Sequence, residues 1–302
     1  MQDLFRHEAL PFAGASRFAR YCAGAVRDGV ESDERVIVLA ASDRLDAVAD
    51  RLGPDADEVT FVATDEHGRN PTRIATLLHT FETAGHGQRS LGVVDMSADG
   101  RSPRAAEELC FSDAVLNLPA LRSWPMSVVC LFDSDRLDDS GMLGVRRCHA
   151  VVRGQDTNVD YDPDYGLEMY GADVEPPPPS AVRHRVGRGG LGGMREFVRR
   201  QAGRHDIAPD RVDDLVLAAN EIVTNSLRHG GGQADMAVWF ADGAVVCEVC
   251  DEGFIDDPLA GRFAPLPSAS SGRGLWLANH LCDLVQVRSV PGRSIVRMYV
   301  DR

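Results

Sequence analysis

The segment PDRVDDLVLAANEIVTNSLRHGGG, from Pro209 to Gly232, constrains the fold most strongly because it has the pattern of one long amphipathic helix. Proline suits the first turn of a helix, and the three closing glycines are a stop signal. At about 100° per residue, one apolar stripe is formed by Val212, Leu215, Ala219, Ile222, Val223 and Leu227. Glu221 and Asn225 stack one turn apart on roughly the opposite side. We predict that the helix packs through this stripe and presents an acid and an amide, although a polar face that only meets water is the commoner pattern.

The residues after this helix form two β-rich runs, ADMAVWF and AVVCEVC, joined by the hairpin signal Ala241-Asp242-Gly243. The second run leads directly into Asp251-Glu252-Gly253, where an aspartate at a strand end can accept a hydrogen bond from a ligand. A loop rich in Pro, Ser and Gly follows, and Gly272-Arg273-Gly274-Leu275 then opens another helix. Glycines at a helix N-terminus leave N–H groups where phosphate oxygens bind. A last hairpin, with Pro291-Gly292 at its turn, ends the chain.

Four motifs thus occur in order: E-x-x-x-N on a helix, D-x-G after a strand, G-x-G-L before a helix and G-x-S in the last turn. Together they resemble the GHKL ATPase (HATPase) fold, the Bergerat α/β two-layer sandwich that gyrase, MutL and histidine kinases share. The segment 187–302 is most similar to the anti-sigma-factor serine kinases, which carry this domain without a histidine-bearing dimerisation helix. The resemblance implies that the segment binds ATP with Mg²⁺.

The resemblance also implies roles for individual residues. Glu221 matches the general base, and Asn225 matches the magnesium ligand. The other positions implied to bind the nucleotide are Asp251, Gly253, Gly272, Arg273, Gly274, Leu275 and Ser294. Among them, Asp251 would read the adenine amino group and Ser294 would lie near the adenine. The family often has a second glycine after the D-x-G motif, where this chain has Ile255, so nucleotide binding is implied more firmly than turnover.

The composition describes an ordinary globular chain of 302 residues, with 44% hydrophobic and 26% charged residues. This length accommodates two domains of common size. A formal net charge of −14 argues against nucleic acid as the main partner, because neutralising phosphates requires a concentrated basic surface. All 32 basic residues are arginine, so chemistry that requires a lysine ammonium is excluded.

The sequence contains no recognisable targeting or membrane-spanning segment, because no run reaches the ~20 apolar residues of a span and the start lacks the apolar core of a signal peptide. We therefore expect a cytoplasmic protein without a membrane partner. The 7 cysteines are scattered, which in a reducing compartment predicts free thiols. Cys247 and Cys250 form a C-x-x-C, but residues three apart on a strand point to opposite faces, so we expect no shared metal or disulfide.

The first half of the chain alternates between apolar runs and helical patterns, which predicts a mostly parallel sheet covered on both faces. The expected strands are 35–41, 58–63, 90–96, 126–132 and 150–152, and the expected helices are 14–30, 44–52, 71–81 and 103–109. No lysine is available to complete a P-loop after the first run, so we expect no P-loop ATPase here. Asp95 and Asp133 each follow an apolar run, and we interpret them as capping or turn residues.

Four pieces within residues 1–155 resemble the MEDS sensory domain, a RecA-like three-layer α/β module: HEALPF near the start, GRNPTRI at 68–74, GRSPRAAEE at 100–108 and VLN at 115–117. The resemblance implies sensing or partner contact and supplies no catalytic residue. The scattered histidines show no metal-binding spacing and are interpreted as ordinary polar residues: His7, His67, His79 and His149. For His7 and Arg69, structural and functional interpretations stay equally open.

Residues 156–186 lose periodicity and contain four consecutive prolines, from Pro176 to Pro179. Such a run favours polyproline II geometry, which makes a semi-rigid spacer of about 3 Å per residue. We therefore divide the chain into a sensory domain 1–155, a linker 156–186 and an ATPase domain 187–302. A short amphipathic helix with its apolar face inward precedes the long helix and contains Met194, Phe197 and Val198.

The combined resemblance implies an anti-sigma regulatory factor that works by partner switching under the control of a sensory domain. Its ATPase domain would phosphorylate a serine or threonine on an STAS-type anti-sigma-factor antagonist and would bind a sigma factor. The family also implies a homodimer formed through the ATPase domain. The alternative is a nucleotide-gated binding protein without phosphotransfer, which Ile255 and the proline-rich loop favour. A sensor histidine kinase is disfavoured, because no long helix pair with a phospho-acceptor histidine precedes the ATPase segment.

Overall fold

The computed structural model describes residues 4–67, 70–97, 101–265 and 272–302. The chain divides into two compact units, residues 1–166 and 167–302. Gly68, Arg69 and Gly100, the side chain of His67 and the end of the loop before Gly272 lie outside the described part. No described helix combines the length and the apolar character that crossing a membrane requires.

The first unit is built on a six-stranded sheet in which all pairings among described strands are parallel, as the alternating sequence pattern predicts. Its strands are β1 (Arg6–Phe12), β2 (Arg35–Ala40), β3 (Val59–Ala63), β4 (Ser90–Asp95), β5 (Met126–Asp133) and β6 (Val151–Val152), in the spatial order β3-β2-β4-β5-β1-β6. Its α-helices are α1 (Phe18–Glu31), α2 (Ser42–Leu52), α3 (Thr64–His67), α4 (Arg73–Thr83), α5 (Pro103–Ala114) and α6 (Asp139–Cys148). Short 3-10 helices cover 15–17, 53–58, 115–117, 119–121 and 134–136.

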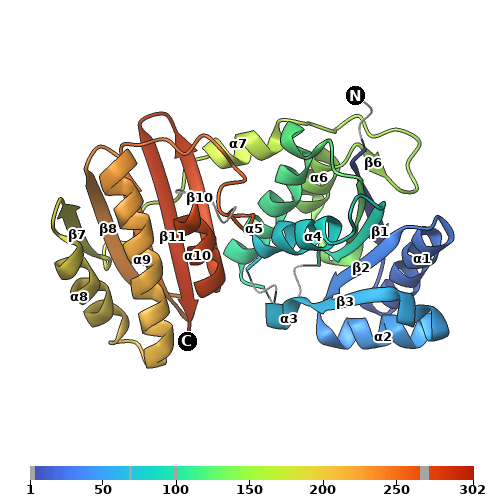
Figure 1. Cartoon of the computed structure of the whole chain (residues 1–302), viewed down its shortest axis with the longest axis horizontal. Helices are drawn as coiled ribbons and strands as arrows, with labels where there is room; N and C mark the ends of the chain where they lie inside the picture. Colours follow the sequence, from blue (N-terminus) through green and yellow to red (C-terminus); the bar gives the residue numbers. More distant parts are fainter. Residues whose placement is uncertain (1–3, 68–69, 98–100, 266–271) are drawn as a thin grey trace. The chain divides into compact units, whose positions relative to one another are not determined.

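Helices cover both faces of this parallel sheet (Figure 1). A core of buried residues lies between one face and the helices α1 and α2, and it includes Leu10 and Phe12 of β1. Because side chains alternate along a strand, His7 points to the opposite face, where its ring meets Asp113 of α5. The unit is therefore an α/β fold in three layers, as predicted.

Strand β1 and helix α6 are among the elements of the first unit that have no counterpart in the sequence predictions. Strand β1 contains no β-branched residue and holds Pro11, so its intrinsic strand preference is weak. It is a strand because it lies between β5 and β6, which supply parallel pairing on both sides. Helix α6 holds Gly141 and Gly144, which are weak helix formers, but Asp138 caps it by accepting a hydrogen bond from the backbone N–H of Gly141 at 2.8 Å.

Asp95 and Asp133 serve the capping and turn roles that were predicted. Asp95 accepts a hydrogen bond from the backbone N–H of Ser97 at 3.0 Å and pairs with the guanidinium of Arg44 at 2.8 Å. Asp133 accepts hydrogen bonds from the backbone N–H groups of Gly14, at 3.0 Å, and of residue 135, at 3.2 Å. Both carboxylates thus hold the loops that follow their strands.

The interpretation of the scattered histidines as ordinary polar residues is wrong for His7 and His149. Both are buried, and their ring centroids lie 4.2 Å apart although 142 positions of sequence, 149 minus 7, separate them. They meet because His7 lies on β1, between β5 and β6, and His149 directly follows helix α6, which covers that face of the sheet. Spacing along the chain gives no sign of this contact.

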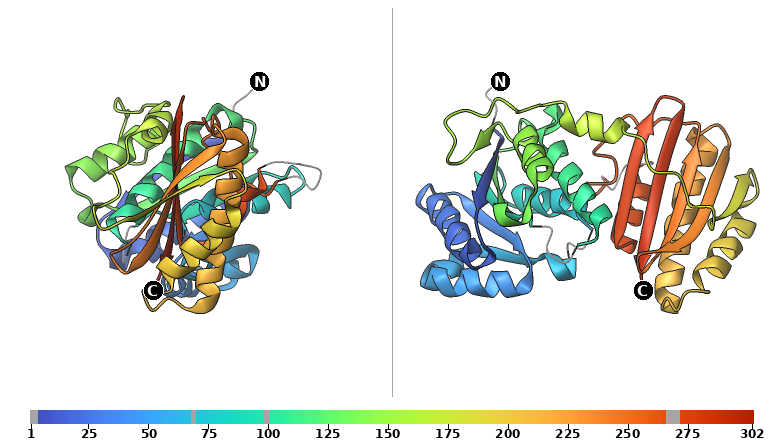
Figure 2. Two further views of the ribbon diagram at one scale, coloured as in Figure 1. Left: turned by 90° about the vertical axis from the view of Figure 1, so that its left-hand side faces the viewer. Right: turned by 180° about the vertical axis from the view of Figure 1, so that it is seen from behind.

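The second unit is a five-stranded antiparallel sheet with helices α8, α9 and α10 on one face (Figure 2). Its strands are β7 (Val182–Gly187), β8 (Gln233–Ala241), β9 (Ala244–Asp251), β10 (Leu284–Val290) and β11 (Arg293–Asp301), in the order β10-β11-β9-β8-β7. Its helices are α8 (Leu191–Ala202), α9 (Pro209–His229) and α10 (Arg273–Leu281), while α7 (Tyr165–Gly171) spans the boundary between the units. This arrangement is the predicted two-layer α/β sandwich.

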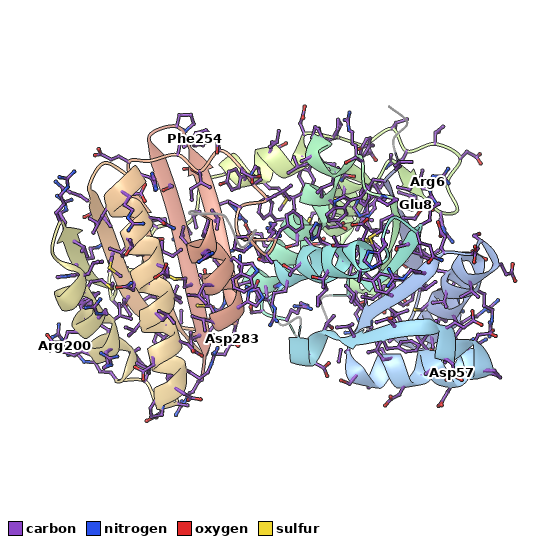
Figure 3. All side chains as sticks on the ribbon, viewed as in Figure 1. Arg6, Glu8, Asp57, Arg200, Phe254 and Asp283 are labelled. Carbon is purple, nitrogen blue, oxygen red and sulfur yellow. The ribbon has the colours of Figure 1, made fainter. Side chains whose placement is uncertain are left out.

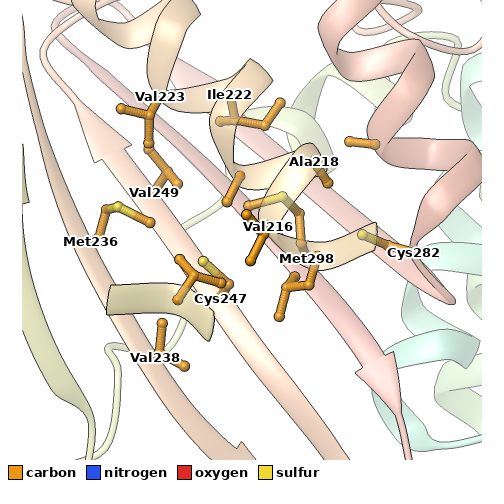
Figure 4. Packing of buried hydrophobic residues seen from close by; sticks show 14 of the residues in the cluster. Val216, Ala218, Ile222, Val223, Met236, Val238, Cys247, Val249, Cys282 and Met298 are labelled. Carbon is orange, nitrogen blue, oxygen red and sulfur yellow. The ribbon is translucent and has the colours of Figure 1, made fainter. Parts of the chain in front are cut away.

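Helix α9 packs through the apolar stripe that its sequence predicts. Ile222 and Val223 face Met236 and Val249 of the sheet in the core of the second unit (Figure 4). The helix ends at His229, because the glycines after it are unfavourable inside a helix.

The two cysteines of the C-x-x-C lie on opposite faces of β9, as expected. Cys247 is in the core beneath the helices, whereas Cys250 is half-buried on the other side, and both are free thiols. Burial raises the pKa of the Cys247 thiol to about 12, so this side chain stays protonated near neutral pH.

Part of the range predicted as a linker is ordered structure of the second unit. Strand β7 pairs with β8, and the hydroxyl of buried Tyr170 donates a hydrogen bond to the carbonyl oxygen of Ile255 at 2.8 Å. Arg293 pairs with Asp173 at 3.0 Å. The residues just before the four prolines therefore lie against this unit, because their side chains and carbonyl groups still find partners on it.

Candidate functional site

Helix α9 places Glu221 and Asn225 one turn apart, and both side chains are half-buried. One carboxylate oxygen of Glu221 lies 3.5 Å from the side-chain nitrogen of Asn220, which is at the limit of a hydrogen bond. Within the described ranges, no hydrogen bond to the Asn225 amide is found. An acid and an amide with free acceptor capacity therefore stand side by side, as the helical spacing predicts.

The first turn of α10 lies directly against this pair. A Cβ atom added at Gly274 would lie 2.8 Å from Asn225 Nδ2 and 3.3 Å from Glu221 Cβ, so the position has no room for a side chain. Gly272 caps the helix with φ of +88°, a left-handed conformation that favours glycine. The first backbone N–H groups of a helix have no intrahelical partner, so the first turn of α10 brings backbone donors close to the acid and the amide.

Leu275 and Arg273 flank Gly274 differently. Leu275 is buried, and a Cβ atom at Gly261 would come within 2.6 Å of its Cβ, so the loop after β9 packs tightly on α10. Arg273 is exposed in the first turn. Leu275 therefore anchors the first turn of α10, while Arg273 presents a positive charge beside it.

A second group of residues surrounds Asp251 at the end of β9. Ser226 Oγ donates to Asp251 Oδ2 at 2.5 Å, while Ser294 Oγ and the backbone N–H of Gly253 both donate to Oδ1 at 2.7 Å. Ser294 reaches the carboxylate because β9 and β11 pair these two residues directly. Three donors therefore orient Asp251 and leave acceptor capacity on Oδ2 for a ligand.

The backbone passes so close to Asp251 that glycines are required. A Cβ atom at Gly230 would lie 2.3 Å from Asp251 Cγ, and one at Gly253 would lie 2.8 Å from Asp251 Oδ1. The end of α9 and the turn after β9 thus form a narrow cradle around the carboxylate. Any larger residue at either position would have to displace Asp251.

The two groups adjoin, because Asn225 and Ser226 are consecutive residues on α9. One end offers a carboxylate, an amide and a helix N-terminus, a set suited to phosphate and a divalent cation. The other end offers an oriented carboxylate that can accept an N–H from a base edge. The glycine cradle and the free amide oxygen fit a nucleotide bound with a cation.

Sequence reasoning missed Ser226, Gly230 and Tyr170. Ser226 had a signal, since it is a polar residue four positions after Ile222 on the buried side of the helix. Gly230 was recognised only as a helix stop, because its contact with Asp251 depends on how β9 and α9 pack. Tyr170 gave no signal, because its partner is 85 positions away.

Ile255 does not need to be glycine in this backbone. It is not among the described non-glycine residues with positive φ, and its side chain packs against the core. Its N–H donates to Ser289 Oγ at 2.9 Å, and its carbonyl accepts from Tyr170. Burial raises the pKa of the Tyr170 hydroxyl, which therefore remains a donor. The neighbouring Phe254, 50% exposed, projects into solvent (Figure 3).

In a comparison with known proteins, one family model matches part of each unit. Residues 188–300 match the family described as "Histidine kinase-like ATPase domain", and residues 6–150 match "MEDS: MEthanogen/methylotroph, DcmR Sensory domain". Similarity is also found to the crystal structure of the RsbU and RsbW domains of Rv1364c from Mycobacterium tuberculosis, at 17% identity and a TM-score of 0.30. That match covers 40% of this chain and 32% of the other, so the chain spans about a third of the solved structure. No curated protein matches the chain.

Proposed function

We propose that this chain, in which a MEDS-type region precedes a histidine kinase-like ATPase domain, is an anti-sigma regulatory factor with ATP-dependent serine/threonine kinase activity. Its substrate would be an STAS-type anti-sigma-factor antagonist, and its second partner would be a sigma factor. The observation that carries the kinase proposal is the pair Glu221 and Asn225 lying against Gly274, next to the cradle of Asp251.

Asp251 is the residue that we propose for base recognition. Its carboxylate is held by Ser226, Ser294 and the N–H of Gly253, and these contacts fix its direction before any ligand arrives. An oriented carboxylate accepts an amino N–H and rejects a carbonyl oxygen, so it prefers adenine to guanine at that edge. Preorganisation of this kind lowers the cost of ordering on binding.

Asn225 and Glu221 are the residues that we propose for the chemistry. The amide oxygen of Asn225 is a hard ligand of the type that Mg²⁺ prefers, and Mg²⁺, when bound, neutralises charge on the phosphate oxygens. Glu221, one turn earlier, accepts the proton of the attacking hydroxyl. The N–H groups of the first turn of α10, from Gly272 to Gly274, contact phosphate oxygens.

The test uses the full-length chain, ATP labelled on the γ-phosphate, and STAS-type proteins of the same genome as candidate substrates. We expect label to appear on a serine or threonine of one candidate and to depend on Mg²⁺. ATP binding and nucleotide-dependent capture of a partner without label transfer would instead support a nucleotide-gated binding protein. Absence of ATP binding would overturn both accounts.

A further inference from the structure

Four metal-binding side chains converge inside the first unit, far in sequence from one another. They are His7 of β1, Asp113 of α5, Cys130 of β5 and His149, which directly follows α6. Each offers one ligand atom, and these atoms all lie within 4.8 Å of one another. All four residues are buried, the most exposed at 7%. In Figure 3, the labelled residues Arg6 and Glu8 mark the strand on either side of His7. We call these four residues the His-Cys-Asp cluster.

The outer nitrogens of both histidines are held by fixed acceptors. The Nδ1 atom of His149 lies 2.8 Å from the carbonyl oxygen of Val145, which can only accept, so Nδ1 carries the proton. The Nδ1 atom of His7 lies 3.1 Å from Asn117 Oδ1, and the amide nitrogen of Asn117 is directed at the carbonyl of Cys148, at 2.6 Å. When Nδ1 is the donor in this way, Nε2 carries a lone pair, and both Nε2 atoms point into the cluster.

The centre of the cluster has more acceptors than protons. Cys130 Sγ lies 3.2 Å from Asp113 Oδ1 and 3.3 Å from His7 Nε2, so its one proton cannot serve both. His7 Nε2 lies 3.0 Å from the same carboxylate. His149 Nε2 is buried without a hydrogen bond to any described residue, 3.5 Å from Asp113 Oδ2. A proton on His7 would satisfy one contact and leave His149 Nε2 unsatisfied, which is costly in a buried site.

A metal cation satisfies all four atoms at once. Tetrahedral ligands at bond lengths of about 2.0–2.3 Å are separated by about 3.3–3.8 Å. The three separations among His7 Nε2, Asp113 Oδ1 and Cys130 Sγ are 3.0, 3.2 and 3.3 Å, which is close to these edges. His149 Nε2 lies 3.5 Å from the other carboxylate oxygen, Asp113 Oδ2, and one ligand atom from each of the four residues lies within 4.8 Å of the others. The second contacts, from Asn117 to His7 and from Val145 to His149, are of the kind that orients metal-bound imidazoles. The thiol loses its proton to solvent when the sulfur–metal bond forms.

We infer that the His-Cys-Asp cluster is a binding site for a divalent transition metal of the zinc type. Thiolate and imidazole ligands exclude Mg²⁺ and Ca²⁺, which take oxygen donors. The two negative ligands, Cys130 and Asp113, balance the charge of the cation. Four protein ligands close a tetrahedral site, so the metal would hold β1, β5, α5 and the end of α6 together. Metal occupancy would then control the stability of the first unit.

The test is Co²⁺ titration of the full-length chain after treatment with a chelator, followed by absorption spectroscopy. We expect one Co²⁺ per chain, with the d–d bands of a tetrahedral ion and a thiolate charge-transfer band, and displacement by Zn²⁺. Cys130→Ala should lose the charge-transfer band. Cys22→Ala, which changes a buried cysteine of the same unit outside the cluster, should keep it.

A second variant keeps the inference testable if Cys130→Ala fails to fold. Asn117→Ala retains all four ligands and removes the partner of His7, together with the hydrogen bonds from the Asn117 amide to the carbonyl groups of Ala114 and Cys148. It should therefore weaken Co²⁺ binding by about 10–100-fold with the same spectrum. Wild-type protein that binds no Co²⁺, or binds it without a thiolate band, would overturn the inference. So would unchanged affinity in both variants.

Discussion

The two polar centres of this chain are assembled in opposite ways. The centre of the second unit takes its acid and its amide from one turn of α9, and its glycines from the ends of neighbouring elements. The His-Cys-Asp cluster takes each of its four residues from a different part of the first unit. In the first case the helix itself sets the distances between functional atoms. In the second, only the packing of the whole sheet sets them.

The largest expected effect tests whether one residue of the helical pair carries the chemistry. Glu221→Gln preserves size and removes the base, so phosphotransfer should fall by roughly 10²–10⁴-fold while ATP affinity is kept. Label transfer to the antagonist and fluorescent-nucleotide titration measure the two quantities separately. Glu196→Gln makes the same change at an exposed position of α8 and should leave both unchanged.

Transfer at the wild-type rate by Glu221→Gln would contradict the role of general base. Helical spacing would then place Glu221 beside Asn225 without giving it a role in phosphotransfer. Co²⁺ binding by the His-Cys-Asp cluster should be the same in this variant, since the ligands of the cluster all belong to the first unit.

A smaller loss should follow removal of the neighbouring amide. In Asn225→Ala the metal-dependent part of ATP affinity should fall by at least about 10–100-fold, the loss typical even for residues one shell away from a metal. Titrations with and without Mg²⁺ isolate that part. An equal loss in both titrations would mean that Asn225 supports the helix or the base pocket and does not bind the cation.

The sequence predicts residues that one helix places together better than residues that the packing of a whole sheet brings together. Glu221 and Asn225 were predicted because a period of 3.6 residues is a local property that the sequence displays directly. Asp251 and Ser294 required a resemblance, since their contact depends on the register between β9 and β11. For His7 the sequence left a structural and a functional interpretation open, because its partners lie more than 100 positions away.

The same limit applies to the fold. Apolar runs and helical patterns predicted most elements of both units, because burial imposes its period on the sequence. Strand β1 was missed because neighbouring strands, and not its own residues, make it a strand. Strand β7 was missed because an exposed edge strand with Arg183 and Arg185 carries little apolar signal. Elements stabilised mainly by distant partners are the ones that local patterns fail to reveal.

The next prediction concerns Asp251 in the second unit, whose contact with Ser294 depends on the register between β9 and β11. Asp251→Asn keeps one acceptor oxygen but faces the ligand or a serine with an N–H₂ group, so ATP affinity should fall by about 1–3 kcal/mol. The measurement is nucleotide titration, with thermal unfolding as a check on folding. Asp213→Asn, at an exposed position near the start of α9, is the matched control. Undiminished affinity for adenine nucleotides would show that Asp251 does not read the base.

The smallest expected effect is on stability, where two Gly→Ala substitutions separate the contribution of helix propensity from that of close packing between α9 and α10. Gly193 of α8 has nothing within 4 Å of an added Cβ, so Gly193→Ala should raise the stability of the second unit by about 0.5–1 kcal/mol. Gly274→Ala gains the same propensity, but its Cβ would lie 2.8 Å from Asn225 Nδ2 and must displace that side chain. We therefore expect no net gain in stability from Gly274→Ala and a loss of Mg²⁺-dependent ATP affinity. Thermal unfolding and nucleotide titration of both variants provide the comparison. If both behave alike, the contact between α9 and α10 does not shape the centre, and helical spacing alone accounts for it.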